Sequence, residues 1–311
     1  MSTQEQTKTA RGISLRRARE LWNEYLPYWF MTPMVLVMLL ITIFPGVYDL
    51  YMSLVAYELT SPSTIGTFVG LSNYETAFTS AGVVHSFVIT IAFVGGALAL
   101  ETIIGFILAA LVAGVKSDRM QKFYRIAFIL PMAVAPVSLA TIFRIMLNAE
   151  VGVVPYLIQT TTPFTAPNFL AEIPLLTVIL IDTWNWTPFM FIIFYAGLSS
   201  VPDTLVEAAK VDGAPMWRRY VHVILPYMKP VVFVATLIRL IDLFRTFGMV
   251  FSLTRGGPGT ATQLVSINIF EQGFRFVNLG VASAIAIVYL VVIVALCNVL
   301  IAKVGFEGVW D

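Results

Sequence analysis

The side chains best suited to chemistry are polar groups that interrupt long apolar stretches of the chain. Asp182, Trp184, Asn185 and Trp186 lie close together in one such stretch. Aromatic rings stack on the faces of sugar rings, and carboxylates and amides hydrogen-bond to hydroxyl groups, so this combination is expected of a pocket for a polyhydroxylated ligand. The alternative is that the tryptophans lie at a helix interface, where a polar group hydrogen-bonds to the neighbouring helix.

A second polar group lies in a later apolar stretch, where Asp242 is three residues from both Arg239 and Arg245. This spacing allows ion pairs along one helix. An ionisable side chain inside a bilayer is costly unless it faces protein or a watery cavity, so such groups are candidates for a substrate path. The alternative is that these charges neutralise one another between helices.

Three further polar residues interrupt apolar stretches. Glu101 lies in the middle of one stretch, and Arg144 and Asn148 lie near the end of another. The same cost of burial in lipid applies to them. We predict a substrate path formed by Arg144, Asn148, Asp182, Trp184, Asn185, Asp242 and Arg245.

A different signal comes from residues 207–226, the one substantial polar segment in the second half of the chain. Its first part, from Glu207 to Val211, is rich in helix-forming residues. Ala208 and Ala209 are small enough for the backbone of a partner to approach closely. Gly213 permits a sharp reversal because it has no side chain to clash at positive φ. The segment predicts a helix–turn–helix outside the bilayer, and the alternative is an amphipathic connector that rests on lipid headgroups.

After this reversal the sequence predicts a second short helix. Trp217 and Tyr220 would give this helix an aromatic face, and Leu225-Pro226 is expected to end it and to begin the next apolar stretch. Such a polar segment between apolar stretches is suited to binding another protein.

The elements that position these residues follow from the composition of the chain. Hydrophobic residues make up 58% of its 311 residues, charged residues 12%, and the mean hydropathy is +0.85. A soluble protein carries about 25% charged residues, so this chain requires a lipid bilayer as its solvent. We expect it to have no nucleic-acid partner.

Six apolar stretches are each long enough for the roughly 20 residues that a membrane-spanning helix needs. The prolines Pro131, Pro136 and Pro188 lie inside the third and fourth stretches and are expected to kink those helices. We predict an all-α membrane protein with a basic segment at 1–28, a six-helix domain at 29–304 that contains the polar loop 199–229, and a short tail at 305–311. The predicted spans are 29–54, 84–115, 123–147, 173–198, 230–253 and 279–304.

The charges of the loops predict how the chain is oriented. Lys116, Arg119, Lys122 and Arg125 lie in the loop after the second span and the first residues of the third, and the loop after the fourth holds four Lys or Arg residues, whereas the loops after the first and third contain none. Because cytoplasmic loops are enriched in Lys and Arg, both termini and the polar loop are expected in the cytoplasm. The chain is therefore expected to be a multi-pass protein of the cell membrane.

Catalytic and metal-binding patterns are missing from the sequence. Cys297 is the single cysteine and the two histidines are far apart, so neither a disulfide nor a metal centre is expected. No stretch matches the Walker A pattern of a P-loop, so any ATP must be hydrolysed by another polypeptide. We expect that this chain is not an enzyme and binds no cofactor of its own.

The polar loop also carries a resemblance. Its spacing of Glu-Ala-Ala, three residues, Gly, nine residues, an aliphatic residue, one residue and Leu-Pro resembles the cytoplasmic EAA loop of ABC importer permeases. Most of the chain resembles the carbohydrate-uptake permeases that include the maltose and glycerol-phosphate permeases. Further motifs match in the same order, namely Gly70-Leu71-Ser72-Asn73-Tyr74, residues 125–131, Trp186-Thr187-Pro188-Phe189, residues 196–202 and residues 253–259.

The resemblance implies the transmembrane domain of a type I ABC importer, a permease subunit that moves a sugar or polyol inward. It implies a second, homologous permease, two ATPase subunits that bind ATP and Mg²⁺, and a periplasmic or lipid-anchored binding protein that delivers the substrate. It also implies that ATPase closure is transmitted through the polar loop. The implied coupling residues are Glu207, Ala208, Ala209, Asp212, Gly213, Leu225 and Pro226.

Two other functions compete with this interpretation. An ion-coupled secondary transporter would need internal repeats and carboxylates that bind the coupling ion, and no convincing repeat is visible. An integral membrane enzyme would need a Ser/His pair or a metal set at helical spacing, which the sequence does not offer. The substrate itself, and whether it carries a phosphate or carboxylate, stays open because Arg144 and Arg245 could face an anion.

Overall fold

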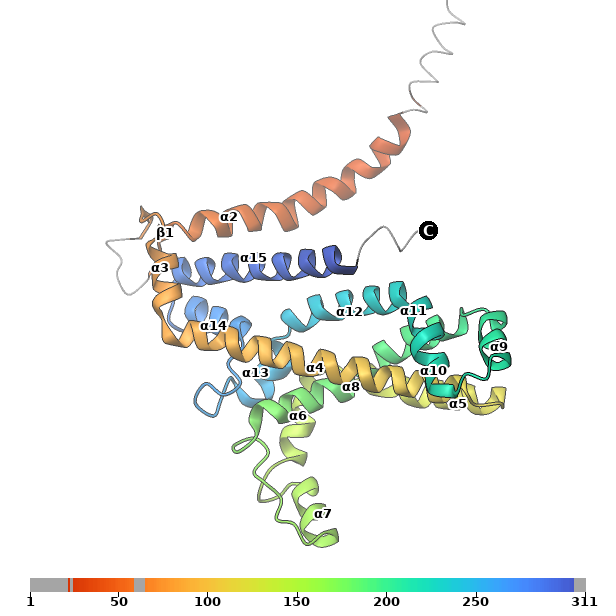
Figure 1. The fold of residues 1–311 in the computed structure, drawn as a ribbon. Helices are drawn as coiled ribbons and strands as arrows, with labels where there is room; N and C mark the ends of the chain where they lie inside the picture. The colour runs from red at the N-terminus through yellow and green to blue at the C-terminus, as the bar shows by residue number, and fades with distance from the viewer. Residues whose placement is uncertain (1–21, 23–24, 59–64, 305–311) are drawn as a thin grey trace, which may run out of the picture.

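A computed structural model describes residue 22 and residues 25–58 and 65–304 of the chain (Figure 1). The described part is almost wholly helical, with one two-stranded antiparallel sheet near one end of the bundle. The expected tail at 305–311 and all but five residues of the expected basic segment 1–28 lie outside the described residues.

The elements run in chain order as follows. The first half contains η1 (Leu39–Ile43), α2 (Phe44–Met52), β1 (Val55–Ala56), β2 (Thr67–Phe68), α3 (Ser72–Thr79), α4 (Ala81–Ala113), α5 (Asp118–Ile129), η3 (Leu130–Ala133), α6 (Pro136–Met146) and α7 (Val153–Thr161). The second half contains α8 (Pro174–Ser199), α9 (Asp203–Val211), α10 (Met216–Arg219), η4 (Tyr220–Ile224), α11 (Leu225–Tyr227), α12 (Lys229–Phe244), α13 (Gly248–Thr254), α14 (Val265–Phe270), η5 (Glu271–Arg275) and α15 (Leu279–Val304).

Within the described residues, four helices are long and apolar enough to cross a membrane. They are Tyr25–Met52, Ala81–Ala113, Pro174–Ser199 and Leu279–Ala302. Two bent helix pairs, Asp118–Ala133 with Pro136–Met146 and Met216–Tyr227 with Lys229–Phe244, raise this number to six when each pair counts as one span. The prediction of an all-α fold with six spans is therefore confirmed with the third and fifth spans broken.

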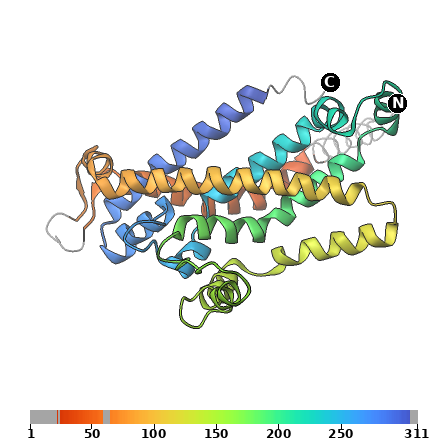
Figure 2. The same cartoon turned by 60° about the horizontal axis from the view of Figure 1, so that its bottom comes forward.

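The centre of the bundle is the pair α4 and α8, which pack along their length (Figure 2). Gly105 of α4 makes this approach possible, because a Cβ at this position would lie 2.7 Å from Cβ of Met190. Phe93, Phe191 and Phe194 are fully buried around this contact. The pair forms the rigid frame against which α12 and α5 pack.

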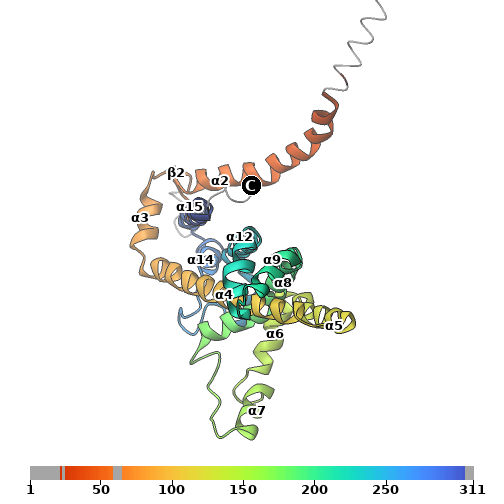
Figure 3. The same ribbon diagram turned by 45° about the vertical axis from the view of Figure 1, so that its right-hand side comes forward.

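The third span breaks where its prolines lie. The α-helix α5 ends at Ile129, the short 3₁₀ helix η3 contains Pro131, and α6 begins at Pro136 after a bend of 89°. Proline lacks the N–H needed for the helical hydrogen bond and disfavours helical geometry in the residue before it. By contrast, α8 continues through Pro188 without interruption. In Figure 3, α7 consequently lies far from the bundle, on the side opposite the helix Tyr25–Met52.

The fifth span differs from the prediction. The predicted span at 230–253 was continuous, whereas α12 ends at Phe244 and α13 starts anew at Gly248. The reason lies in packing: α13 lies against α6, and a Cβ at Gly248 would be 3.1 Å from Cγ2 of Val137. Pro226 also does not end a helix, since α11 includes it and the bend of 71° follows at Met228.

Candidate functional site

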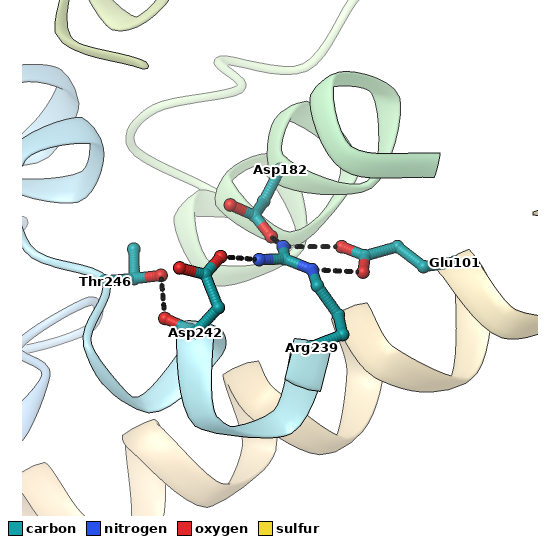
Figure 4. Close-up of polar contacts among 5 residues, drawn as sticks. All are labelled: Glu101, Asp182, Arg239, Asp242 and Thr246. Atoms are coloured by element: carbon teal, nitrogen blue, oxygen red, sulfur yellow. Dashed lines mark hydrogen bonds and ion pairs between the residues drawn. The ribbon is translucent and has the colours of Figure 1, made fainter. Parts of the chain in front are cut away.

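Four charged side chains from three helices meet in the middle of the bundle. Arg239 of α12 donates from Nε and Nη2 to the carboxylate of Glu101 on α4, at 2.6 and 2.8 Å (Figure 4). The same guanidinium pairs with Asp182 of α8 and with Asp242 one turn further along α12. Arg239, Glu101 and Asp182 are buried. We call these four residues the Arg239 cluster.

The cluster explains why so many charges are tolerated in an apolar interior. A buried charge is strongly unfavourable unless it is paired and hydrogen-bonded, and the planar guanidinium offers five N–H groups in a fixed arrangement. The carboxylates of the cluster accept four hydrogen bonds from Arg239. The guanidinium carbon also lies 4.8 Å from the centre of the Trp186 ring, in cation–π contact. The cluster therefore joins α4, α8 and α12.

A cavity of about 280 Å³ lies next to the cluster. Asp182 and Trp186 of α8 and Asp242 of α12 line it, together with residues from both helix breaks. Those residues are Pro136, Val137, Arg245, Thr246, Phe247, Gly248 and Met249. The breaks in the third and fifth spans thus create an opening in the bundle beside its charged centre, where irregular backbone can be tolerated because it lines a cavity.

Three of the seven residues predicted for the substrate path line this cavity. Asp182 contributes a buried carboxylate, and Asp242 a carboxylate whose side chain is 43% exposed. Arg245 follows the last residue of α12 and is exposed. The spacing of Arg239 and Asp242 allowed an ion pair along one helix, and this pair forms while Asp242 stays partly exposed at the cavity.

The other four predicted residues do not line the cavity. Trp184 is exposed and packs edge-on against Phe143, with ring centres 5.7 Å apart. Arg144 is exposed in the last turn of α6. Asn148 accepts hydrogen bonds at Oδ1 from the backbone N–H groups of Glu150 and Val151, which places it in the turn that follows α6.

Asn185 connects α8 to the break in the third span. Its side-chain amide donates to the carbonyl of Pro131 at 2.8 Å, and Asn185 itself is buried. This carbonyl belongs to η3, the segment where regular helical hydrogen bonding stops. The same carbonyl also accepts from the backbone N–H of Val134 at 3.2 Å, so the amide of Asn185 adds a second donor at the break.

We expect Asn185→Ala to destabilise the protein, because it removes the side-chain hydrogen bond that joins α8 to the Pro131 carbonyl. The carbonyl keeps the Val134 N–H as a donor, so the loss should be about 0.5–1.5 kcal/mol. The matched variant is Asn298→Ala, since the Asn298 amide donates only to a carbonyl of its own exposed helix and its loss should be small. Thermal unfolding of the two purified variants checks this, and an unchanged midpoint for Asn185→Ala would contradict the assigned contact.

Sequence reasoning could find the cluster residues but not their arrangement. Glu101, Arg239 and Trp186 were recognisable as polar or aromatic residues within spans, yet nothing in the sequence says that one guanidinium bridges three helices. The cavity residues Val137 and Phe247 were missed altogether. These residues lie at the two helix breaks, so predicting the breaks would have found them. Pro131 and Pro136 indicated the break in the third span, whereas nothing in the sequence indicated the break in the fifth.

The polar loop forms a helix–turn–helix at the end of the bundle opposite α3 (Figure 1). Glu207 and Ala208 are exposed on α9, whereas Ala209 is buried beneath them. Asp212 ends α9, and Gly213 follows with φ of +72° and open space where a side chain would be. Leu225 and Pro226 begin α11 and are exposed.

Of the large apolar side chains on this surface, Trp217 belongs to the aromatic face that the sequence predicted, whereas Val211 and Met216 were not singled out. Val211 is 88% exposed, and Met216 and Trp217 are also exposed. They lie around the reversal at Gly213, next to the exposed Glu207 and Ala208. We call the exposed parts of α9, of α10 and of the turn between them the loop surface. Aromatic and methionine side chains in such a place are typical of protein–protein contacts.

Comparison with known proteins places this geometry among membrane transport components. Residues 102–304 match the sequence model of the family described as binding-protein-dependent transport system inner membrane component. The match includes the cavity, the loop surface and three of the four residues of the Arg239 cluster. Glu101 lies just before it.

Individual relatives match over nearly the whole chain. The probable ABC transporter permease protein y4oQ of Sinorhizobium fredii is 30% identical over 307 residues, 97% of each chain. The trehalose transport system permease protein SugA of Mycobacterium tuberculosis is 30% identical and covers 92% of this chain and 90% of its own. A solved bacterial ABC transporter involved in import of the acidic polysaccharide alginate has the same fold, with a TM-score of 0.79, 21% identity and coverage of 93% and 98%.

Proposed function

The chain belongs to the family of binding-protein-dependent transport system inner membrane components, and from this membership we propose how it works as the permease subunit of a carbohydrate ABC importer. Its fold is that of a type I importer transmembrane domain. The observation that carries the proposal is the family match over residues 102–304, which spans the loop surface and the cavity. The ion-coupled alternative gains no support from any comparison.

The cavity beside the Arg239 cluster is the part of the substrate path that this chain supplies. Asp182 and Asp242 offer carboxylate oxygens to hydroxyl groups, and Trp186 offers a ring on which a sugar can stack. Arg245 is the cation at this cavity. Asn185 and Trp184 support the path by packing, and Arg144 and Asn148 lie on the α6 side of it.

The loop surface is the docking site for an ATPase subunit. Glu207, Ala208, Asp212 and Gly213 form its polar and small-residue part, and Val211 and Trp217 its apolar part. ATP and Mg²⁺ are bound by the ATPase subunits. ATP binding favours the closed state of the two ATPase subunits over the open state. The docked loop surface transmits this preference to the membrane-spanning helices.

The assembled importer contains this chain, a second homologous permease, two ATPase subunits and an extracytoplasmic binding protein that delivers a sugar or polyol. This chain lies in the cell membrane with both termini and the loop surface in the cytoplasm. The apolar helix Tyr25–Met52 supports such an assembly, because its most apolar window is wholly exposed within this chain and needs lipid or a partner.

Gentle purification of the tagged chain from native membranes, followed by mass spectrometry, tests this function. We expect a second six-span protein and an ATPase at a ratio of about 1:1:2 with this chain, the ratio implied by one ATPase for each permease. A chain that is recovered alone or as a homo-oligomer, and still transports in liposomes without ATP, would overturn the proposal.

A further inference from the structure

We propose that the cavity beside the Arg239 cluster selects its ligand by charge, admitting neutral or cationic polyhydroxylated ligands and rejecting anionic ones such as sugar phosphates and uronates. This inference rests on the proposed function in one respect, namely that the cavity is part of the substrate path. The relatives leave the question open, since one is named for trehalose and the transporter of known structure imports an acidic polysaccharide.

The residues around the cavity carry an excess of negative charge. The Arg239 cluster contains three carboxylates and one guanidinium. Of the four cluster residues Asp182 and Asp242 line the cavity, and Arg245 adds one cation, so two carboxylates and one guanidinium face it. The remaining lining residues carry no formal charge. The excess is negative, and charges in a site of low dielectric act strongly on one another.

Arg239 has few free N–H groups with which it could bind an anion. Four hydrogen bonds run from its five N–H groups to carboxylates of the cluster. One face of the guanidinium lies against Trp186, 4.8 Å from the ring centre. Its positive charge is therefore already neutralised by the protein. Arg239 acts as a positioning residue, since it fixes the two aspartates and the tryptophan that line the cavity.

Asp182 and Asp242 each keep one carboxylate oxygen that is not paired with Arg239. Arg239 pairs with one carboxylate oxygen of Asp182 and one of Asp242. Figure 4 shows that the other oxygen of each carboxylate points away from the guanidinium, on the side of the cluster where Thr246 lies. Thr246 lines the cavity together with both aspartates. These oxygens can accept hydrogen bonds from hydroxyl or ammonium groups, whereas they repel phosphate and carboxylate oxygens.

The reaction rates of charged thiol reagents can measure the electrostatic potential in the cavity without knowledge of the substrate. A reporter cysteine replaces Val137, a cavity residue with 52% exposure, in a chain whose only cysteine is removed by Cys297→Ala. The full chain, purified with its associated subunits, is treated with a cationic and an anionic methanethiosulfonate of similar size. The cysteine thiolate displaces methanesulfinate and forms a mixed disulfide in both reactions. Any change in thiolate fraction affects both rates equally and cancels from their ratio.

We expect the cationic reagent to react about tenfold faster than the anionic one, after division by the same ratio for free cysteine. Asp242→Asn removes one negative charge and should lower the ratio severalfold. This variant keeps Arg239 paired with Glu101 and Asp182, so the cluster should still form. Thr246→Cys supplies a second reporter, and Glu150→Gln, which removes a carboxylate outside the cavity lining, is the matched control that should leave the ratio unchanged.

The proposal is overturned if the cationic-to-anionic rate ratio at both reporters equals the ratio for free cysteine. It is also overturned if Asp242→Asn leaves the ratio at the reporters unchanged. Reporters that neither reagent modifies overturn it as well, because the cavity would then admit no small charged solute. The proposed function fails differently, through a chain that purifies without an ATPase, and that result leaves the measured ratio unaffected.

Discussion

Arg239→Met is expected to destabilise the protein more than any other single substitution discussed here. The change leaves Glu101 and Asp182 buried without their cation, and the methionine can offer no hydrogen bond. Removing one partner of a buried ion pair costs about 3–5 kcal/mol, a large share of the roughly 5–15 kcal/mol that stabilises a folded domain. We expect at least about a threefold fall in membrane abundance and a fall of roughly 10 °C in the thermal midpoint.

Arg245→Met is the matched control for this experiment. Arg245 lies six residues further along, is exposed, and makes no ion pair with any residue in the described part of the chain. Its loss should leave abundance and midpoint nearly unchanged, because exposed charges contribute little to stability. Arg239→Lys should be intermediate, since an ammonium keeps the charge but cannot reproduce the bidentate contact with Glu101.

A rescue variant separates lost charge balance from lost volume. Adding Glu101→Gln and Asp182→Asn to Arg239→Met removes the two buried charges that the single variant leaves unpaired. If charge is the cause, the triple variant should recover part of the lost stability, because coupled residues are not additive. A triple variant that is less stable than Arg239→Met alone would show that the cluster does not act through its charges.

The comparison of sequence and structure is instructive at these same positions. Hydropathy indicated six apolar stretches, which agrees with four long helices and two bent helix pairs, because it depends on the solvent that each stretch needs. It could not see that the fifth span stops at Phe244, since averaging over about 19 residues hides a break of three. It also could not tell that Asn185 faces the Pro131 carbonyl whereas Asp182, one turn earlier, faces Arg239.

The loop was easier to predict than the site for a physical reason. A helix, a glycine reversal and a second helix are set by local backbone preferences, and Gly213 has the positive φ that its type suggested. The site depends on contacts between residues far apart in sequence, such as Glu101 and Arg239. A polar residue in a span indicates that it has a buried partner, but the sequence does not identify that partner.

Gly213→Asp is expected to abolish coupling to the ATPase while the chain stays in the membrane. The position has φ of +72° and no atom within 4 Å of an added Cβ, so the folded chain has room for the side chain. The left-handed conformation costs about 1–2 kcal/mol, and aspartate is among the residues that tolerate it best. The new carboxylate would lie in the middle of the loop surface, where docking requires close approach and would bury the charge without a partner.

The measurement is the amount of ATPase subunit that purifies with the chain, together with its ATP turnover. For Gly213→Asp we expect at least about a fivefold loss of both, because a misplaced charge in a contact surface costs several kcal/mol and each 1.4 kcal/mol is tenfold in affinity. Membrane abundance should stay within about twofold of the unchanged chain, since the strain is small beside the total stability.

Gly66→Asp isolates the effect of position from the effect of strain. Gly66 has φ of +84° and also has no atom within 4 Å of an added Cβ. It directly precedes β2, which pairs with β1 at the end of the bundle opposite the loop surface (Figure 1). The two variants share residue type, backbone strain and added charge, so a docking defect confined to Gly213→Asp must come from where the side chain lies. Full ATPase recovery with Gly213→Asp would instead place the docking contact outside the turn, and equal losses in both variants would trace the defect to strain.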